Sequence, residues 1–182
     1  MKDTLISRRE FLKDIGMIGA GVLLSASPWL SAFSEVVETS GEKCRLAIIG
    51  PGSRGRFLMS FLVQNPKVEI VALCDIYQPS IEKALELAPK AKVYDDYREI
   101  LEDKTVDAVL VATPLNSHCQ IVLDAFDAGK HVFCEKSIGF TMEECFRIYN
   151  KHISTEKVFF TGQQRLFDPR YIKAMEMIHA GT

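Results

Sequence analysis

Residues 45–56 read RLAIIGPGSRGR, a short apolar run followed by three glycines. Residues 46–49 are typical of a buried strand, and Gly50, Gly52 and Gly55 form G-x-G-x-x-G where a helix should begin. The first glycine of this motif makes the tight turn, the second lets a pyrophosphate approach the backbone, and the third allows close helix–strand packing. The N–H groups at the start of such a helix favour a diphosphate. The stretch therefore predicts a dinucleotide-binding loop.

A second apolar run, residues 68–74, ends at Asp75, twenty positions after the third glycine. This is the expected place for an acid that hydrogen-bonds the adenosine ribose hydroxyls. A carboxylate there repels a 2′-phosphate, and the two residues that follow offer no cation to hold one. The cofactor expected is therefore NAD, with NADP disfavoured. Two alternatives stay open: Arg54 or Arg56 reaching a 2′-phosphate, and a purely structural glycine turn.

Strands and helices are predicted to alternate from residue 45 onward. Residues 108–112 are apolar throughout, as a central parallel strand should be. Asn116 and Ser117 are expected to cap the helix that follows. The expected strands are residues 46–49, 68–75, 91–94, 108–112, 131–134 and 158–161, and the expected helices are about 54–64, 79–88, 97–101, 118–128 and 141–153. This order predicts an α/β fold with a doubly wound parallel sheet, a Rossmann domain over residues 43–162.

The first 34 residues read as a leader. Arg8 and Arg9 are followed by a moderately apolar stretch at residues 15–24, a layout that resembles a bacterial twin-arginine export signal. Small residues before Glu35 indicate cleavage there. We expect the twin-arginine export machinery as a partner and a periplasmic protein. The alternatives are an uncleaved leader that anchors the chain in the membrane, and a cytoplasmic protein with an amphipathic leader.

Composition excludes some other functions. The net charge is −2 with acids and bases interspersed, so no basic stripe indicates nucleic-acid binding. The five cysteines form no C-x-x-C pair, and we interpret them as free thiols with neither a disulfide nor a metal role. They are Cys44, Cys74, Cys119, Cys134 and Cys145.

In the order and spacing of its motifs, the chain resembles the Gfo/Idh/MocA family of NAD(P)-dependent oxidoreductases from about residue 44 to residue 182. The matching pieces are the glycine motif, Cys74-Asp75, Ala112-Thr113-Pro114 with His118, Ala128-Gly129-Lys130-His131-Val132, Glu135-Lys136, and Gly162-Gln163-Gln164-Arg165-Leu166-Phe167-Asp168-Pro169. The resemblance implies that Lys136 lies beside the nicotinamide and the substrate. Ser137 replaces the proline usual in the family, and a cis bond before a non-proline residue costs about 2.5–4 kcal/mol, so a cis bond is disfavoured here.

The candidate catalytic residue is Lys136, which follows a predicted strand and so should project into the crevice at the carboxyl ends of the strands. A lysine there holds a substrate hydroxyl or relays its proton; the alternative is a surface lysine at a strand end. The candidate cofactor-binding residues are Gly50, Gly52, Ser53, Arg54, Gly55, Asp75, Thr113, Pro114, Asn116, His118, Glu135 and Arg165. For His118 a surface position at a helix start, and for Arg165 a local pair with Asp168, are equally good interpretations.

The resemblance also implies a second domain. Residues 163–182 are expected to form the crossover segment and the helix that lead to a C-terminal α/β domain, which this chain lacks. In the family that domain supplies most substrate contacts and often mediates oligomerisation, so we expect a homo-oligomer only for a full-length parent. The chain is then either a fragment or the product of a truncated gene.

Three functions are consistent with the sequence. The leading one is a nicotinamide-dependent oxidoreductase acting on a sugar, a polyol or a related hydroxy compound, with this chain as its cofactor-binding half. The second is a glycosidase that uses NAD for transient oxidation; the resemblance implies that such members commonly replace the lysine, so Lys136 argues against it. The third is a truncated nucleotide-binding fragment without catalysis.

The arginine pair generates a test of export. Replacing Arg8 and Arg9 with lysine should retain a reporter fusion in the cytoplasm, because the twin-arginine signal requires the pair. Cell fractionation measures the outcome. Continued export of the double variant would contradict the assignment.

Overall fold

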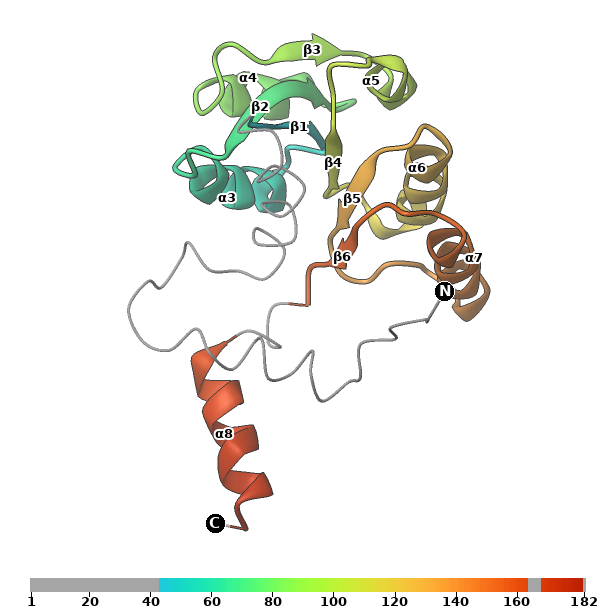
Figure 1. Ribbon diagram of the computed structural model, residues 1–182. Coiled ribbons are helices and arrows are strands. Elements are labelled where there is room, and N and C mark those ends of the chain that lie inside the picture. Colours follow the sequence, from blue (N-terminus) through green and yellow to red (C-terminus); the bar gives the residue numbers. More distant parts are fainter. Residues whose placement is uncertain (1–42, 164–167, 182) are drawn as a thin grey trace.

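The computed structural model of the chain describes residues 43–163 and 168–181 (Figure 1). The predicted export signal, its cleavage site and Arg165 lie outside these residues. Within them, no helix combines the length and the apolar character needed to cross a bilayer.

Six strands form one parallel sheet with the order β3-β2-β1-β4-β5-β6. The strands are β1 (Cys44–Ile49), β2 (Val68–Cys74), β3 (Lys92–Tyr94), β4 (Ala108–Val111), β5 (His131–Cys134) and β6 (Phe159–Thr161). Chain order runs outward in opposite directions from the neighbouring β1 and β4, where Ile49 lies opposite Val111. The predicted doubly wound sheet is confirmed, and ligands of such sheets bind at this switch point, beyond the carboxyl ends of the strands.

Helices cover both faces of the sheet (Figure 1). One face carries α3 (Ser53–Leu62) and α4 (Gln78–Leu85), and the other carries α5 (Tyr97–Glu102), α6 (Leu115–Asp127) and α7 (Met142–Ile153). The last described helix, α8 (Pro169–His179), buries none of its residues.

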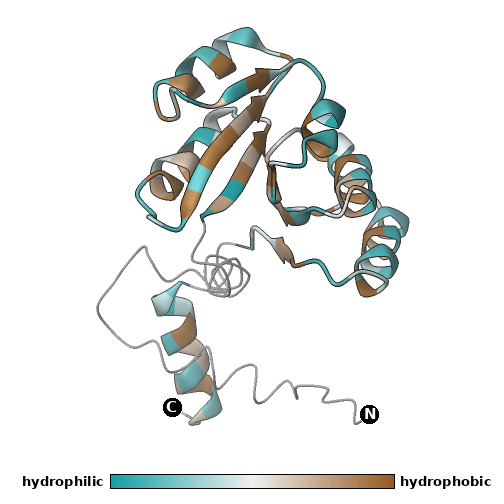
Figure 2. Cartoon of the chain, turned by 45° about the horizontal axis from the view of Figure 1, so that its top comes forward, coloured by the Kyte–Doolittle hydropathy of each residue, from teal (hydrophilic) through white to brown (hydrophobic). Residues whose placement is uncertain are grey.

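The two apolar layers explain why the central strands read as unbroken hydrophobic runs. Every residue of β4 is buried, because side chains alternate between the layer under α3 and α4 and the layer under α5, α6 and α7. Figure 2 shows the apolar colour concentrated on the central strands and on the inward sides of the helices. The two faces of the central strands are therefore filled by side chains, and the known place for a ligand in such a sheet is at the strand ends.

Local sequence signals set most helix ends. Thr141 and Glu144 form a capping box at the start of α7, which is where the sequence predicts a helix to begin. Gly129 follows α6 with φ +70°, the left-handed conformation expected there.

The expected cap of α6 was wrong. The helix begins at Leu115 with Pro114 as its N-cap, and Asn116 and Ser117 already lie within its first turn. The Ser117 hydroxyl lies 2.8 Å from both Thr113 Oγ1 and the Pro114 carbonyl. Because the Ser117 hydroxyl forms these contacts inside the first turn, it does not cap a helix that begins at residue 118.

All five cysteines are free, and four of them are buried. Burial raises the pKa of the Cys44 and Cys134 thiols to about 12 and that of Cys74 to about 11. Such thiols stay protonated near neutral pH and are poor nucleophiles.

Candidate functional site

The glycine motif forms the turn between β1 and α3. Gly50 has φ +85°, and a Cβ on it would lie 2.7 Å from the backbone nitrogen of Thr113, so only glycine fits this turn. The N-cap of α3 is Gly52, which provides no side-chain cap, and the first turn of the helix holds no acid. The N-terminus of α3 therefore keeps donors and a positive dipole end for an anion.

The other two glycines differ in what surrounds them. A Cβ on Gly55 would lie 2.5 Å from the Gly50 carbonyl oxygen, so Gly55 permits the close contact of α3 with the loop. A Cβ on Gly52 would meet no atom within 4 Å, and its φ of −61° is open to any residue. The fold itself therefore does not require glycine at position 52. The open space beside Gly52 fits the close approach of a pyrophosphate.

Asp75 directly follows the carboxyl end of β2 and is half-buried. Its Oδ1 accepts a hydrogen bond of 2.9 Å from the Tyr77 backbone N–H. Its Oδ2 has no hydrogen-bond partner among residues 43–163 and 168–181. One carboxylate oxygen is thus oriented by the protein and the other is available to ribose hydroxyls.

The two arginines of the motif are already bonded. Arg54 donates from Nε to Glu135 Oε1 at 2.7 Å, and its Nη2 lies 2.7 Å from the same oxygen. Arg56 donates from Nη1 to the Pro51 carbonyl at 2.7 Å. Neither arginine is directed at Asp75, so the alternative in which they hold a 2′-phosphate gains no support.

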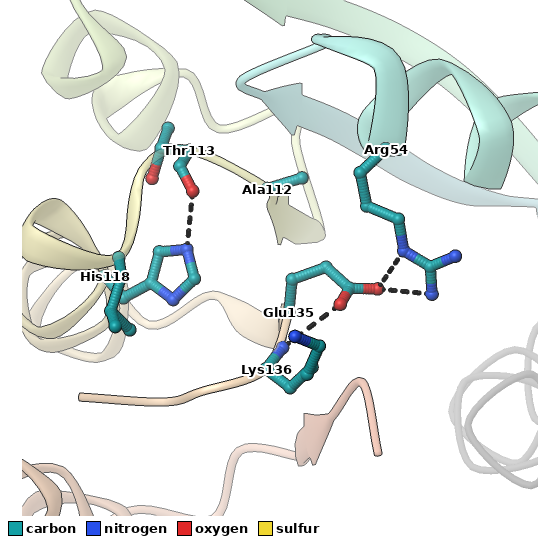
Figure 3. A pocket seen from close by; sticks show the side chains of 7 residues that line it. Arg54, Ala112, Thr113, His118, Glu135 and Lys136 are labelled. Atoms are coloured by element: carbon teal, nitrogen blue, oxygen red, sulfur yellow. Dashed lines mark hydrogen bonds and ion pairs between the residues drawn. The ribbon is translucent and has the colours of Figure 1, made fainter. Parts of the chain in front are cut away.

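A cavity of about 270 Å³ opens beside the ends of β4 and β5 (Figure 3). It is lined by Arg54, Ala112, Thr113, Leu115, His118, Glu135 and Lys136. Five of these seven were predicted as site residues, so the structure brings residues from three separate segments of the sequence to one place.

Glu135 is a buried carboxylate within this wall. Only 5% of the residue is exposed, and its Oε2 accepts a hydrogen bond of 3.1 Å from the Lys136 backbone N–H. A Cβ on Gly162, just beyond β6, would lie 2.8 Å from the Glu135 carboxyl carbon. The carboxylate is therefore enclosed by α3, by its own strand end and by the end of β6.

Lys136 is exposed at the cavity wall (Figure 3). The peptide bond from Lys136 to Ser137 is cis, so the expectation of a disfavoured cis bond was wrong, and the serine takes up the geometry that the family resemblance associates with proline. Ser137 also contributes its carbonyl oxygen to a contact of 2.8 Å with His118 Nδ1.

His118 does not lie on the surface, as one interpretation of its helix position had it. The residue is 2% exposed, and its Nε2 lies 2.8 Å from the Thr113 carbonyl oxygen (Figure 3). Both ring nitrogens are thus directed at backbone atoms.

The remaining predicted residues are more dispersed. Ser53, Pro114 and Asn116 are exposed and do not line the cavity. Arg165 lies outside the described residues. Asp168 caps α8 and forms an ion pair of 2.7 Å with Arg170, so a local structural role accounts for it.

Sequence reasoning did not name Ala112, Leu115 or Gly162 as site residues, although Ala112 and Gly162 belong to pieces that match the family. Leu115 follows the Thr-Pro break after β4, and that break alone placed it near the crevice. For Gly162 the signals were its place in the last matching piece and its position at the end of the sixth strand, which pairs with β5.

Known proteins match this chain over the region that forms the parallel sheet. Residues 44–163 match the profile of the Gfo/Idh/MocA oxidoreductase family, described by its NAD-binding Rossmann fold. The chain belongs to this family. Its members include NAD-dependent oxidoreductases and family 109 glycosidases.

Individual relatives fall into two groups. The chain is 31% identical over 188 residues to a glycosyl hydrolase family 109 protein of Stenotrophomonas maltophilia, covering 97% of this chain and 39% of the relative. It is 31% identical over 138 residues to a myo-inositol 2-dehydrogenase of Thermotoga maritima, covering 76% of this chain and 41% of the relative. The chain therefore spans about two-fifths of the length of the relatives it matches.

The solved structures agree on the fold. The crystal structure of myo-inositol dehydrogenase from Lactobacillus casei in complex with NAD(H) and myo-inositol superimposes with a TM-score of 0.72 and 32% identity. The match covers 76% of this chain and 42% of that one. The described Rossmann domain therefore has the fold of a domain known to bind NAD(H).

The glycine motif generates a paired test. Gly52→Ala should lower NAD affinity about tenfold, or about 1.4 kcal/mol, because the methyl group enters the pyrophosphate path. Its unfolding temperature should not fall, since the Cβ meets no atom. Gly55→Ala should instead lower the free energy of unfolding by about 1–3 kcal/mol, the usual cost of overpacking.

Isothermal titration with NAD and thermal unfolding measure the two effects on the same preparations. A Gly52→Ala variant that binds NAD as tightly as the wild type would show that the pyrophosphate does not bind at this loop.

Proposed function

We propose that this chain is the cofactor-binding half of a nicotinamide-dependent oxidoreductase acting on a sugar, a polyol or a related hydroxy compound. The observation that carries the proposal is Lys136, exposed in a cavity that also meets the end of β4 and the first turn of α3. The dehydrogenase relatives, named for myo-inositol, support a polyhydroxylated substrate.

The cofactor side of the proposal rests on residues that fit NAD. The uncapped N-terminus of α3 would hold the diphosphate, with Gly52 leaving the space it needs. Asp75 would accept from the ribose hydroxyls through Oδ2, and Thr113 would line the nicotinamide half. When bound there, NAD supplies the hydride acceptor.

The chemical role falls to Lys136. Its backbone N–H is fixed on the Glu135 carboxylate while its side chain remains exposed at the cavity. The side-chain nitrogen would hold a substrate hydroxyl; as the neutral amine it would take the hydroxyl proton when the hydride leaves the carbon, and as the ammonium it would return that proton in the reverse direction. Glu135 is occupied by Arg54 and by this N–H, so we assign it no proton transfer.

Export through the twin-arginine route to the periplasm belongs to the same proposal. Its support is the pair Arg8-Arg9 and the apolar stretch that follows.

One observation favours a second candidate, the NAD-dependent glycosidase. Alignment with the family 109 relative covers 97% of the chain and so extends through most of the leader, whereas alignment with the dehydrogenase covers 76%. Identity is 31% in both cases and does not separate them. Assays of the full-length parent with hydroxy sugars plus NAD, and with aryl glycosides, decide between the two.

Asp75 generates a prediction on cofactor choice. The wild type should bind NAD more tightly than NADP, and Asp75→Ala should weaken NAD binding about tenfold or more, because a hydrogen bond to a charged group contributes about 1.5–3 kcal/mol. Glu82→Ala, which removes an exposed acid from α4, is the matched control. Titration with both cofactors checks this; tighter binding of NADP that Asp75→Ala leaves unchanged would overturn it.

Lys136 generates a prediction on turnover. Lys136→Ala in the full-length parent should lower kcat about 10²–10⁴-fold, the range for a positioned acid or base, with NAD affinity little changed. Lys90→Ala, at an exposed lysine distant in sequence, should leave both unchanged. Steady-state kinetics and NAD titration measure the effects, and near-normal turnover of the Lys136 variant would refute the role.

A further inference from the structure

His118 lies where two loops of the site meet. It belongs to the first turns of α6, and its ring lies between the loop after β4 and the loop after β5. Nδ1 is 2.8 Å from the Ser137 carbonyl oxygen and Nε2 is 2.8 Å from the Thr113 carbonyl oxygen. At 2% exposure His118 is almost fully shielded from solvent.

Both partners are carbonyl oxygens, which only accept hydrogen bonds. A neutral imidazole has one N–H, so it would leave the other nitrogen with its lone pair against an oxygen at 2.8 Å. An imidazolium donates to both. Burial and the nearby helix N-terminus oppose the charge, as do the cations of Arg54 and Lys136 on the cavity wall, while the buried Glu135 carboxylate on that wall favours it.

We propose that His118 is a positioning residue that donates from both ring nitrogens and thereby ties the loop of Lys136 to the end of β4. The two charge-assisted hydrogen bonds offset the opposing effects. His118 then has no N–H left for a cofactor or a substrate, so it acts through the backbone and is not a direct cofactor ligand.

The consequence for Lys136 rests on the proposed function, in which this lysine acts in the chemical step. Its two neighbours in the chain are both held. The Glu135 carboxylate is bound by Arg54, and the Ser137 carbonyl is bound by His118. The backbone of Lys136 is therefore fixed on both sides, while its side chain stays exposed.

A second histidine of the same chain, His131, provides a reference for the number of protons on the His118 ring. His131 Nδ1 accepts a hydrogen bond of 3.0 Å from the Val158 backbone N–H, so that nitrogen carries no proton. Burial lowers the pKa of His131, which keeps its ring neutral near neutral pH. His118 and His131 should therefore show opposite protonation patterns in one sample.

The first arm of the test is independent of any activity. Nitrogen NMR of the histidine-labelled 182-residue chain at pH about 7.5 should show both ring nitrogens of His118 protonated and only one of His131. The His118→Asn variant assigns the signals. A His118 ring with a single N–H overturns the proposal.

The second arm measures turnover of the full-length parent. His118→Asn can place its amide nitrogen near the position of Nδ1 and keep the bond to Ser137, whereas His118→Gln reaches the position of Nε2 and keeps the bond to Thr113. We expect the Gln variant to lose about 10²-fold in kcat, as for a misplacement of about 1 Å, and the Asn variant to lose less. NAD affinity should be unchanged in both.

The outcomes separate the competing roles. Equal losses of kcat in the two variants, or a loss of NAD affinity alone, would overturn the positioning role. If the parent shows no dehydrogenase activity at all, the proposed function fails, and the protonation of His118 is still decided by NMR.

Discussion

The buried carboxylate of Glu135 is the constraint around which this site is organised. A carboxylate that is 5% exposed is tolerated only when it is paired, because removing an ion from water costs several kcal/mol. Its cation is Arg54, in the first turn of α3, 81 residues earlier in the chain. The same carboxylate accepts from the Lys136 N–H and packs against Gly162. The glycine motif, the candidate acid–base residue and the last strand are therefore joined through one charged group.

Close backbone packing gives that pair its fixed geometry. Gly55 lets α3 contact the Gly50 carbonyl, and the turn at Gly50 lies against Thr113 at the end of β4. The start of α3 is thus pressed onto the switch point of the sheet, and Arg54 has little freedom to leave Glu135. Since helix position and ion pair depend on each other, a ligand at the N-terminus of α3 and a substrate near Lys136 would meet a preformed site, which reduces the ordering cost of binding.

The sequence predicted what local patterns determine. Apolar runs located the six strands, and Thr141 with Glu144 located the start of α7, because the signal and its consequence lie within one turn. Contacts between residues that are distant in the sequence have no comparable local pattern that would predict them. Lys130 is a clear case: it is buried, with its amine 2.7 Å from the Asp103 carbonyl oxygen, and burial lowers its pKa. The burial of His118 and the Arg54–Glu135 pair depended in the same way on contacts that only the fold creates.

The cysteines connect the fold to the proposed location. A protein exported with unpaired thiols must keep them from oxidation, and the thiolate is the reactive form. Cys44, Cys74 and Cys134 are buried in the sheet with raised pKa values, and Cys119, a residue of α6, is buried against α7. Because this protection exists only after folding, it suits a route that moves folded chains. The thiols would be most vulnerable before the sheet closes, and that stage precedes export on the proposed route.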